Sequence, residues 1–325
     1  MSAAITETRS ATRDEWLRAA EACPYATFFH TPMWAEAFSA YTRGAVMPEP
    51  VWIAFDDGAA LVVAMCRKRL RLGITRLVSS PAGTFGGWVT ADSLNAGHAR
   101  AAAAHLVRLP NLIWRENPYD PLLGEIDIPG SATDNTHAVD LREGFDPVYA
   151  RWSRGHVNAV NKAKRGGVVV GRAGAVEDWR RHFDSYRQLR HRWRKPSTDY
   201  RWRLFEALRE NQSDHIVLWA AQRDGRQLAS VICFYWNTHA VAWHAAASRE
   251  DFGIRANHYM YYEIMRDAAA RGYHWFDMNP SGGSPGVASF KEHLGCRELP
   301  SRVVIRRSGI QKLVGAAKRI AASGA

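Results

Sequence analysis

The chain has 325 residues, of which 46% are apolar and 23% are charged, and its formal net charge is +11. This length is typical of two domains, and the proportions are those of a folded globular protein, which excludes an intrinsically disordered chain. No run of about 18 apolar residues could form a membrane-spanning helix, and the positive charge favours anionic partners such as phosphates, RNA or lipid headgroups.

The first half of the chain, residues 1–150, is predicted to form one domain of helices and short strands. Thr12 and Thr31 precede stretches with helical spacing and are predicted N-caps. The Asp-Gly pair at 57–58 permits the positive φ of a tight turn and predicts a hairpin. The expected elements are helices over 12–23 and 32–42, a hairpin over 50–70, a loop over 76–89, a helix over 92–109 and strands over 111–117 and 136–141.

The second half, residues 151–325, is predicted to form a second domain with a similar order of elements. Three strands, a helix and a further strand predict a mixed α/β layer rather than a doubly wound sheet. The expected elements are helices over 176–193 and 199–211, a hairpin over 215–237, a strand over 239–248, a helix over 256–272 and a strand over 273–278. Because the first half approximates this order, the pattern indicates a structural duplication.

Positive charge is concentrated in residues 151–209, which hold sixteen Lys or Arg against five Asp or Glu. Arg154, Lys162 and Arg165 share one helical face with Asn158, and we predict that this face contacts substrate phosphates. A solvated helix face is the alternative. Aromatic residues interleave with the charges and suit either base stacking or core packing. They are Trp179, Tyr186, Trp193, Tyr200 and Trp202.

Motifs of several enzyme classes are missing from the sequence. It contains no G-x-S-x-G elbow, no H-E-x-x-H and no G-x-x-x-x-G-K-[ST] phosphate loop, so hydrolase, zinc-protease and P-loop functions are not supported. The four cysteines lie far apart and form no C-x-x-C pair. We therefore expect buried thiols, with neither a disulfide framework nor a metal site.

Four segments, in chain order, resemble a known family. They are "FFHTPMWAEAF" (28–38), "SSPAGTFGGWV" (79–89), "HAVDLREGFDPVYARWSRGHVNAVNKAKRGGVVV" (137–170) and the stretch from "AVAWHAAAS" to "FKEHLG" (240–295). Through them the chain resembles the Fem-type branch of the GNAT acyltransferase superfamily, which includes peptidoglycan-bridge aminoacyltransferases and acetyltransferase-like proteins of polysaccharide gene clusters. The resemblance implies an α/β (α+β) fold of tandem GNAT-like domains, each with a mixed, mostly antiparallel sheet flanked by helices.

The stretch "FDMNPSGGSPGVASFKEHLG" (276–295) follows an apolar strand with a Gly, Pro and Ser loop that leads to Phe290 and Lys291. The resemblance implies that this pair is catalytic, because in tRNA-using members the Phe carbonyl and the Lys ammonium assist transfer. A lysine there stabilises an oxyanion, neutralises a phosphate or protonates a leaving oxygen. The alternative is a solvated helix residue beside Glu292.

A possible donor-binding loop precedes the helix over 256–272. Ordinary superfamily members bind the pyrophosphate of acyl-CoA through a [QR]-x-x-G-x-[GA] loop at a helix N-terminus. "REDFGIRAN" (249–257) lies at the equivalent place, with Gly253 and Ala256 one residue too far apart. Arg255 and Asn257 would lie at the helix N-terminus and bind a phosphate or carboxylate of the donor, whereas Gly253 serves either the ligand or only the turn.

Two strand residues are further candidates. Asp277, at a strand end, either accepts the proton of the acceptor amine or caps the loop through backbone N–H groups. His244 lies at an alternating strand position with Trp243 expected on the opposite face. It is a base or substrate-binding residue, or else a hydrogen-bonded core histidine.

These features predict an N-acyltransferase that moves an acyl or aminoacyl group to an amine of a cell-envelope or polysaccharide precursor, without metal or covalent intermediate. Acyl-CoA or aminoacyl-tRNA would be the co-substrate, with no permanently bound cofactor. The expected partner is an anionic small-molecule or lipid-linked precursor. tRNA is a further candidate partner. The alternative is a non-catalytic RNA-binding or membrane-surface-binding protein on the same scaffold.

The two ends of the sequence bear on location. The N-terminal residues lack a basic region followed by an apolar one, so we expect a cytoplasmic protein. The tail "SGIQKLVGAAKRIAASGA" (308–325) is basic and amphipathic, which predicts either peripheral contact with the inner membrane face or packing on the second domain. The chain lacks a long charged segment for the coiled-coil arm of some tRNA-using members, which weakens the inference of tRNA use.

Overall fold

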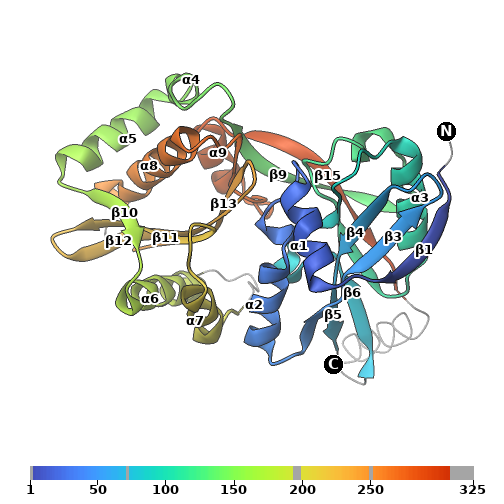
Figure 1. The fold of residues 1–325 in the computed structure, drawn as a ribbon. Helices are drawn as coiled ribbons and strands as arrows, with labels where there is room; N and C mark the ends of the chain where they lie inside the picture. The colour runs from blue at the N-terminus through green and yellow to red at the C-terminus, as the bar shows by residue number, and fades with distance from the viewer. Residues whose placement is uncertain (1–2, 71–72, 193–198, 249–251, 308–325) are drawn as a thin grey trace, which may run out of the picture. The chain divides into compact units, whose positions relative to one another are not determined.

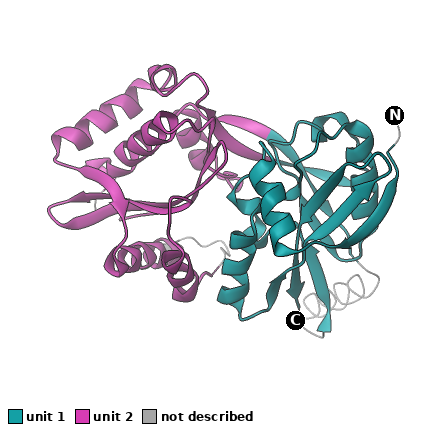
Figure 2. Cartoon of the chain, viewed as in Figure 1, with its two compact units in different colours: residues 1–134, 300–325 teal, residues 135–299 magenta. Residues whose placement is uncertain are grey.

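A computed structural model describes residues 3–70, 73–192, 199–248 and 252–307 (Figure 1). The chain divides into two compact units (Figure 2), Met1–Asp134 with Pro300–Ala325 as unit 1 and Asn135–Leu299 as unit 2. This division differs from the predicted boundary at residue 150, because the end of β9 (Ser131–Asp140) pairs with β14 (Trp275–Asp277). The end of β15 (Arg297–Ile305) in turn pairs with β8 (Leu112–Arg115) of unit 1.

Unit 1 contains two groups of paired strands. The strands β1, β3, β4 and β7 form an antiparallel sheet in that order. The second group has the strands β15, β8, β6, β5 and β2 side by side in that order, and β6 and β8 run parallel. The bounds are β1 Ile5–Ser10, α1 Arg13–Ala22, η1 Phe28–His30, α2 Pro32–Thr42, β2 Val46–Pro48, β3 Val51–Phe55, β4 Ala60–Ala64, β5 Cys66–Arg69, β6 Thr75–Val78, η3 Pro81–Gly83, β7 Gly87–Val89, α3 Ala96–Leu106 and η4 Leu123–Glu125.

Local signals in unit 1 give the expected helix starts. The Thr12 side chain accepts a hydrogen bond from the backbone N–H of Glu15, and that of Thr31 accepts one from Trp34, so both predicted N-caps are confirmed. The core of unit 1 is formed by apolar residues of the sheets and α3, among them the fully buried Ile53 and Trp114. Burial of these side chains holds the helices against the sheets.

Unit 2 has the predicted order of three strands, a helix and a strand. Its strands lie in the order β10, β11, β12, β13, β14 and β9, and neighbours are antiparallel except β13 and β14, which are parallel. The predicted mixed α/β (α+β) fold with sheets flanked by helices is confirmed. The bounds are α4 Asp146–Ala150, α5 Arg154–Arg165, β10 Val169–Ala173, α6 Val176–Arg192, α7 Trp202–Glu210, β11 Ile216–Arg223, β12 Arg226–Trp236, β13 His239–Ala247, η5 Phe252–Ile254, α8 Ala256–Ala270 and α9 Pro285–Glu292.

Helices cover both faces of the unit 2 sheet, with α5 and α8 on one face and α6 and α7 on the other (Figure 1). Helix α8 faces the sheet because Ala256, Met260, Ile264 and Ala268 recur at every fourth position and are all buried. Gly272, with φ 80°, follows α8 and terminates it as predicted. The buried face of α8 therefore runs along most of the helix, from Ala256 to Ala268.

Strand β13 contains a bulge that was not predicted. Ile232 of β12 opposes His244 whereas Cys233 opposes Ala242, so Trp243 is an extra residue. The predicted placement of Trp243 on the face opposite His244 is wrong, because the extra residue breaks the period of two. Both rings contact Tyr200, with centroids 5.5 and 6.0 Å away, and they lie 5.3 Å from each other.

The parallel pairing beside the bulge is short. Within the described residues, β13 pairs with β14 only as far as Val241 and Asp277, whereas β13 continues to Ala247. The Ala242 carbonyl on this edge accepts a hydrogen bond from Asn279, and the β13 edge beyond Ala242 offers backbone N–H and C=O groups to a ligand. The four cysteines are buried and free, which confirms the predicted thiols. None of the helices in the described part of the chain is long and apolar enough to cross a membrane.

Candidate active site

A pocket of about 430 Å³, the α8 pocket, lies along the edge of β13 that β14 leaves uncovered. Most of its walls are apolar, and two large side chains at it, Phe252 and Val287, are 54% and 41% exposed. Such exposure marks a surface suited to an apolar ligand. The lining residues are Leu189, Leu228, Ala229, Ala245, Ala246, Ala247, Ser248, Phe252, Arg255, Ala256, Asn257, His258, Val287 and Phe290.

The N-terminus of α8 opens into this pocket. Arg255 precedes the helix in the left-handed conformation, with φ 66° and ψ 22°, and its side chain caps no backbone N–H. The first N–H groups of a helix lack intrahelical partners and carry a partial positive charge, so this end can bind an anion. Two of the predicted donor-binding residues, Arg255 and Asn257, line the pocket. Gly253 lies in η5, does not line it, and has open space where a Cβ would be.

Phe290, predicted from the resemblance, lines the same pocket beside two histidines that sequence reasoning missed. Its ring centroid lies 5.4 Å from that of His156 and 5.3 Å from that of His258. Burial, followed by the neighbouring His156 and Arg255, lowers the pKa of His258 to about 4, so this ring is neutral near pH 7. The His258 ring beside Phe290 therefore adds no charge to the pocket near pH 7.

Lys291 lies beneath the Gly-rich loop rather than in solvent. Only 5% of the residue is exposed, and its Nζ donates a hydrogen bond of 2.6 Å to the carbonyl oxygen of Asn279. Burial lowers the pKa of the Lys291 ammonium to about 8, against the opposing effects of Cys296 and Asp277. The alternative of a solvated helix lysine is therefore wrong.

Asp277 and Asn279 hold the start of this loop. The Asp277 carboxylate is fully buried and accepts hydrogen bonds from Thr136 Oγ1 at 2.8 Å and from the Asn279 N–H at 2.6 Å. This confirms that Asp277 caps the loop. Asn279, with φ 60°, also donates from Nδ2 to the Ala242 carbonyl at 2.8 Å. One asparagine thus links Lys291 to β13 next to the bulge.

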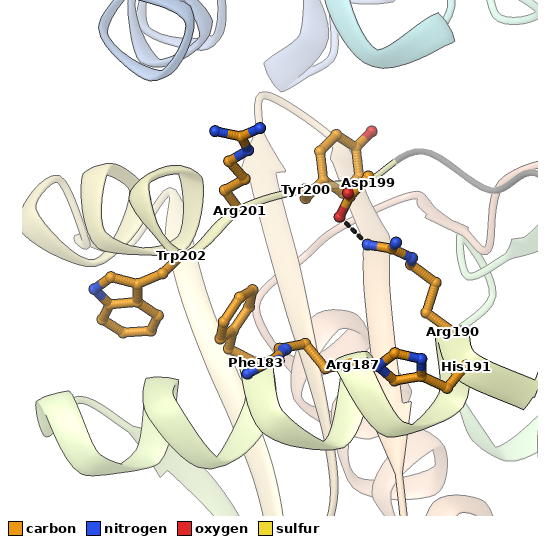
Figure 3. Close-up of a pocket in the computed structure, with 8 residues that line it drawn as sticks. All are labelled: Phe183, Arg187, Arg190, His191, Asp199, Tyr200, Arg201 and Trp202. Atoms are coloured by element: carbon orange, nitrogen blue, oxygen red, sulfur yellow. Dashed lines mark hydrogen bonds and ion pairs between the residues drawn. The ribbon is translucent and has the colours of Figure 1, made fainter.

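A second pocket, the α6–α7 pocket, has a volume of about 320 Å³ and a different character (Figure 3). Three arginines and three aromatic side chains come from α6, from the segment that leads into α7 and from the first residue of α7, and Arg190 forms an ion pair with Asp199. Guanidinium groups beside aromatic faces suit an anion joined to a planar or apolar group. The lining residues are Phe183, Arg187, Arg190, His191, Asp199, Tyr200, Arg201 and Trp202.

Residues 151–292 match the family model described as an acetyltransferase (GNAT) domain. This matched stretch is called the GNAT domain below. The match lies entirely within unit 2 and contains the residues of both pockets. No curated protein sequence matches the chain.

Solved structures share the fold of the GNAT domain together with unit 1. A crystal structure of FemX superposes with a TM-score of 0.70 at 14% identity, covering 95% of this chain and 100% of that one. A conserved protein of unknown function from Bacteroides thetaiotaomicron gives 0.57 at 11% identity, covering 93% and 100%. The C-terminal domain of a putative lysylphosphatidylglycerol synthetase from Agrobacterium fabrum gives 0.55 at 12% identity, covering 95% and 97%. The predicted resemblance to the Fem-type branch is confirmed as one of fold.

The basic region of the GNAT domain divides between packed and exposed residues. Trp179 and Tyr186 are buried, and the Trp202 ring lies 4.1 Å below the guanidinium of Arg180. Arg154, Asn158, Lys162 and Arg165 are exposed on α5 and line neither pocket. Trp193 and the tail over 308–325 lie outside the described residues.

His244 of the GNAT domain lies on the α6 face of the sheet. Its Nδ1 is 2.9 Å from Nε2 of His182, so the predicted alternative of a hydrogen-bonded histidine is confirmed. His182 was not singled out, because 62 residues separate it from His244. Within the described ranges, no three His, Cys, Asp or Glu side chains are grouped as a metal site would need.

Proposed function

We propose that the protein is an N-acyltransferase that moves an acyl or aminoacyl group from an activated donor to an amine of a cell-envelope or polysaccharide precursor. The uncapped N-terminus of α8, open to an apolar pocket at the uncovered edge of β13, carries this proposal. A helix N-terminus binds phosphate, and apolar walls suit the chain that joins a phosphate to an acyl carbon. The GNAT domain supports acyl transfer as the reaction class.

Acyl-CoA and aminoacyl-tRNA are the two candidate donors, because each carries phosphate groups together with a reactive thioester or ester. The size and apolar walls of the α8 pocket support acyl-CoA. The fold shared with a putative lysylphosphatidylglycerol synthetase supports an aminoacyl donor. Neither donor requires a permanently bound cofactor.

Lys291 and Phe290 act, in this proposal, on the donor. The buried ammonium of Lys291 stabilises the developing oxyanion or protonates the leaving atom, since charge interactions are strong where water is excluded. Phe290 forms part of the wall against which the donor lies. Asp277 positions the loop through Asn279.

We assign the acceptor to the α6–α7 pocket by its charge. Arg190 is paired with Asp199, and the two further arginines, Arg187 and Arg201, favour an amine-bearing molecule that also carries a phosphate or carboxylate. A lipid-linked precursor would meet this requirement and would bring the protein to the inner membrane face.

Label transfer tests the proposal directly. Purified protein is incubated with radiolabelled acetyl-CoA or with a labelled aminoacyl-tRNA pool, together with cell-envelope precursors, with and without RNase. RNase-resistant transfer to an amine identifies acyl-CoA as the donor, and RNase-sensitive transfer identifies aminoacyl-tRNA. Absence of transfer from both donors would contradict the proposal and favour a non-catalytic protein that binds RNA or membranes through the exposed cations of α5.

A further inference from the structure

Asn279 lies in the loop over 278–284, just after β14, and forms hydrogen bonds to three elements of the GNAT domain. Its N–H donates to the Asp277 carboxylate at 2.6 Å, and its Nδ2 donates to the Ala242 carbonyl of β13 at 2.8 Å. Its own carbonyl accepts the 2.6 Å hydrogen bond from Lys291 Nζ of α9. Because these bonds use three different groups of one residue, β13, β14 and α9 are joined at a single point.

The backbone of Asn279 adopts a conformation that few residues with a Cβ tolerate. Its φ is 60°, in the left-handed region, which asparagine enters more readily than most other residues. A glycine would adopt the same φ but would lack the side-chain amide that reaches β13. The asparagine is therefore needed for the hydrogen bond to Ala242 and not for the turn alone.

The hydrogen bond from Asn279 to Ala242 marks where the uncovered edge of β13 begins. The pairing of β13 with β14 ends at Val241, and Ala242 is the next residue. Ala245, three residues further on, is the first residue of β13 that lines the α8 pocket. A donor that enters at the N-terminus of α8 and follows this edge therefore meets Asn279 at Ala242, where Lys291 Nζ is held.

The ammonium of Lys291 has donors beyond the one that Asn279 accepts. An ammonium carries three N–H donors, and within the described residues the structure shows one of them in a hydrogen bond. Because the Lys291 side chain is buried, solvent does not decide how the ammonium lies. The bond to Asn279 therefore determines where the other two donors are available to a ligand.

We propose that Asn279 is a positioning residue for acyl transfer, which fixes the end of the donor along β13 through Ala242 and holds Lys291 Nζ at the same place through its carbonyl. A misplacement of about 1 Å between reacting groups can lower a rate about 100-fold, so one fixed point for the donor and the lysine favours transfer. Asp277, which accepts hydrogen bonds from Thr136 and Asn279, keeps that point in place. This inference rests on the proposed function, which gives Lys291 its role on the donor.

The kinetic test compares Asn279→Gly with Asn111→Gly in unit 1. Asn111 is the matched control, because it also has a left-handed backbone, with φ 56°, and its Nδ2 donates to a carbonyl, that of Thr75. We expect kcat to fall about tenfold or more in Asn279→Gly, with the KM of the donor within about threefold of the wild type. Asn111→Gly should keep the wild-type kcat. A folded Asn279→Gly protein with wild-type kcat would overturn the proposal.

The titration of Lys291 separates positioning from a general loss of stability. Carbon-13 NMR of lysine-labelled protein follows Cε of Lys291, with the signal assigned through Lys291→Met. Burial gives Lys291 a pKa of about 8, and in Asn279→Gly we expect a midpoint at least about one pH unit higher, because the loop no longer excludes water from the ammonium. An unchanged midpoint in the folded variant would overturn the proposal.

Proton exchange in the wild-type protein gives a measurement that needs neither activity nor a variant of Asn279. Nitrogen-15 NMR should show that the Nζ protons of Lys291 exchange with water at least about tenfold more slowly than those of the exposed Lys68, because they are buried and hydrogen-bonded. Equal exchange rates would overturn the proposal even if Asn279→Gly fails to fold. Absence of acyl transfer by the wild type would instead refute the proposed function, and the exchange and titration of Lys291 would still decide whether Asn279 holds this lysine.

Discussion

Two groups of cations in the GNAT domain lie in opposite environments. Lys291 is buried below the 278–284 loop and bonded to a backbone carbonyl, whereas Arg154, Lys162 and Arg165 project from α5 into solvent. A solvated cation attracts anions over a distance but is screened by salt, whereas a buried one acts at short range on a group that displaces water. The density of charge along the sequence therefore does not identify the residue with the strongest electrostatic effect.

Lys291→Met gives the largest expected effect. Removing this buried ammonium group should lower the rate of acyl transfer by about 100-fold or more, because charged groups stabilise the transition state where water is excluded. The measurement is label transfer at saturating donor. Lys68→Met, at an exposed lysine of β5, is the control and should keep wild-type activity. If a folded Lys291→Met protein transferred label at the wild-type rate, the buried lysine would have no greater effect on the reaction than the exposed cations of α5.

The same lysine should make stability depend on pH. Its pKa is about 8 in the folded protein against 10.5 for an ordinary lysine, so the unfolded chain binds more protons between these values. Stability relative to Lys291→Met should therefore rise by about 3 kcal/mol as the pH rises from 8 to 10.5, and stay constant below 8. Urea unfolding of both proteins at several pH values measures this difference. A constant difference across the range would mean that Lys291 is solvated.

Charge reversal in the α6–α7 pocket should affect the acceptor alone. Arg187→Glu with Arg201→Glu should raise the KM of an anionic acceptor about tenfold, with a smaller effect at high salt, because each arginine offers charge-assisted hydrogen bonds. Lys162→Glu with Arg165→Glu on α5 is the matched comparison, and about a threefold change is expected there. Equal effects of the two double variants would place the acceptor on a broad basic surface.

Arg255→Gly should have the smallest effect. Arg255 is exposed and adopts a left-handed conformation that is strained for a residue with a Cβ, so glycine should stabilise the fold by about 1 kcal/mol. Thermal unfolding measures this change. Gly253→Ala, for which space is open, should leave the unfolding temperature unchanged. A lower stability of Arg255→Gly would show that the guanidinium makes contacts that outweigh the strain.

The sequence predicts the elements whose signals are local. The hairpin of β11 and β12 follows from an Asp-Gly turn between apolar strands, and α8 follows from its period of four and from Gly272. The resemblance located Phe290 at a pocket wall. These features depend on neighbours in the chain, so a single sequence is sufficient to predict them.

Other features depend on contacts between distant residues. The bulge at Trp243 is set by the pairing of β12 with β13, and an alternating pattern cannot show the extra residue. The burial of Lys291 results from how the 278–284 loop packs, and nothing in the segment "SFKEHLG" distinguishes it from a solvated lysine. His182 and His244 meet only because α6 packs on the sheet.

The return of the chain to unit 1 through β15 has a consequence for synthesis on the ribosome. Val303, Val304 and Ile305 pair with β8, and Arg302 bonds to the buried Glu116 at 2.8 Å. Residues 1–134 leave the ribosome before residues 135–299, yet unit 1 lacks this strand until residues 303–305 have been made. Although domains generally fold in order from the N-terminus, the GNAT domain here has all its residues available before the unit that precedes it is complete.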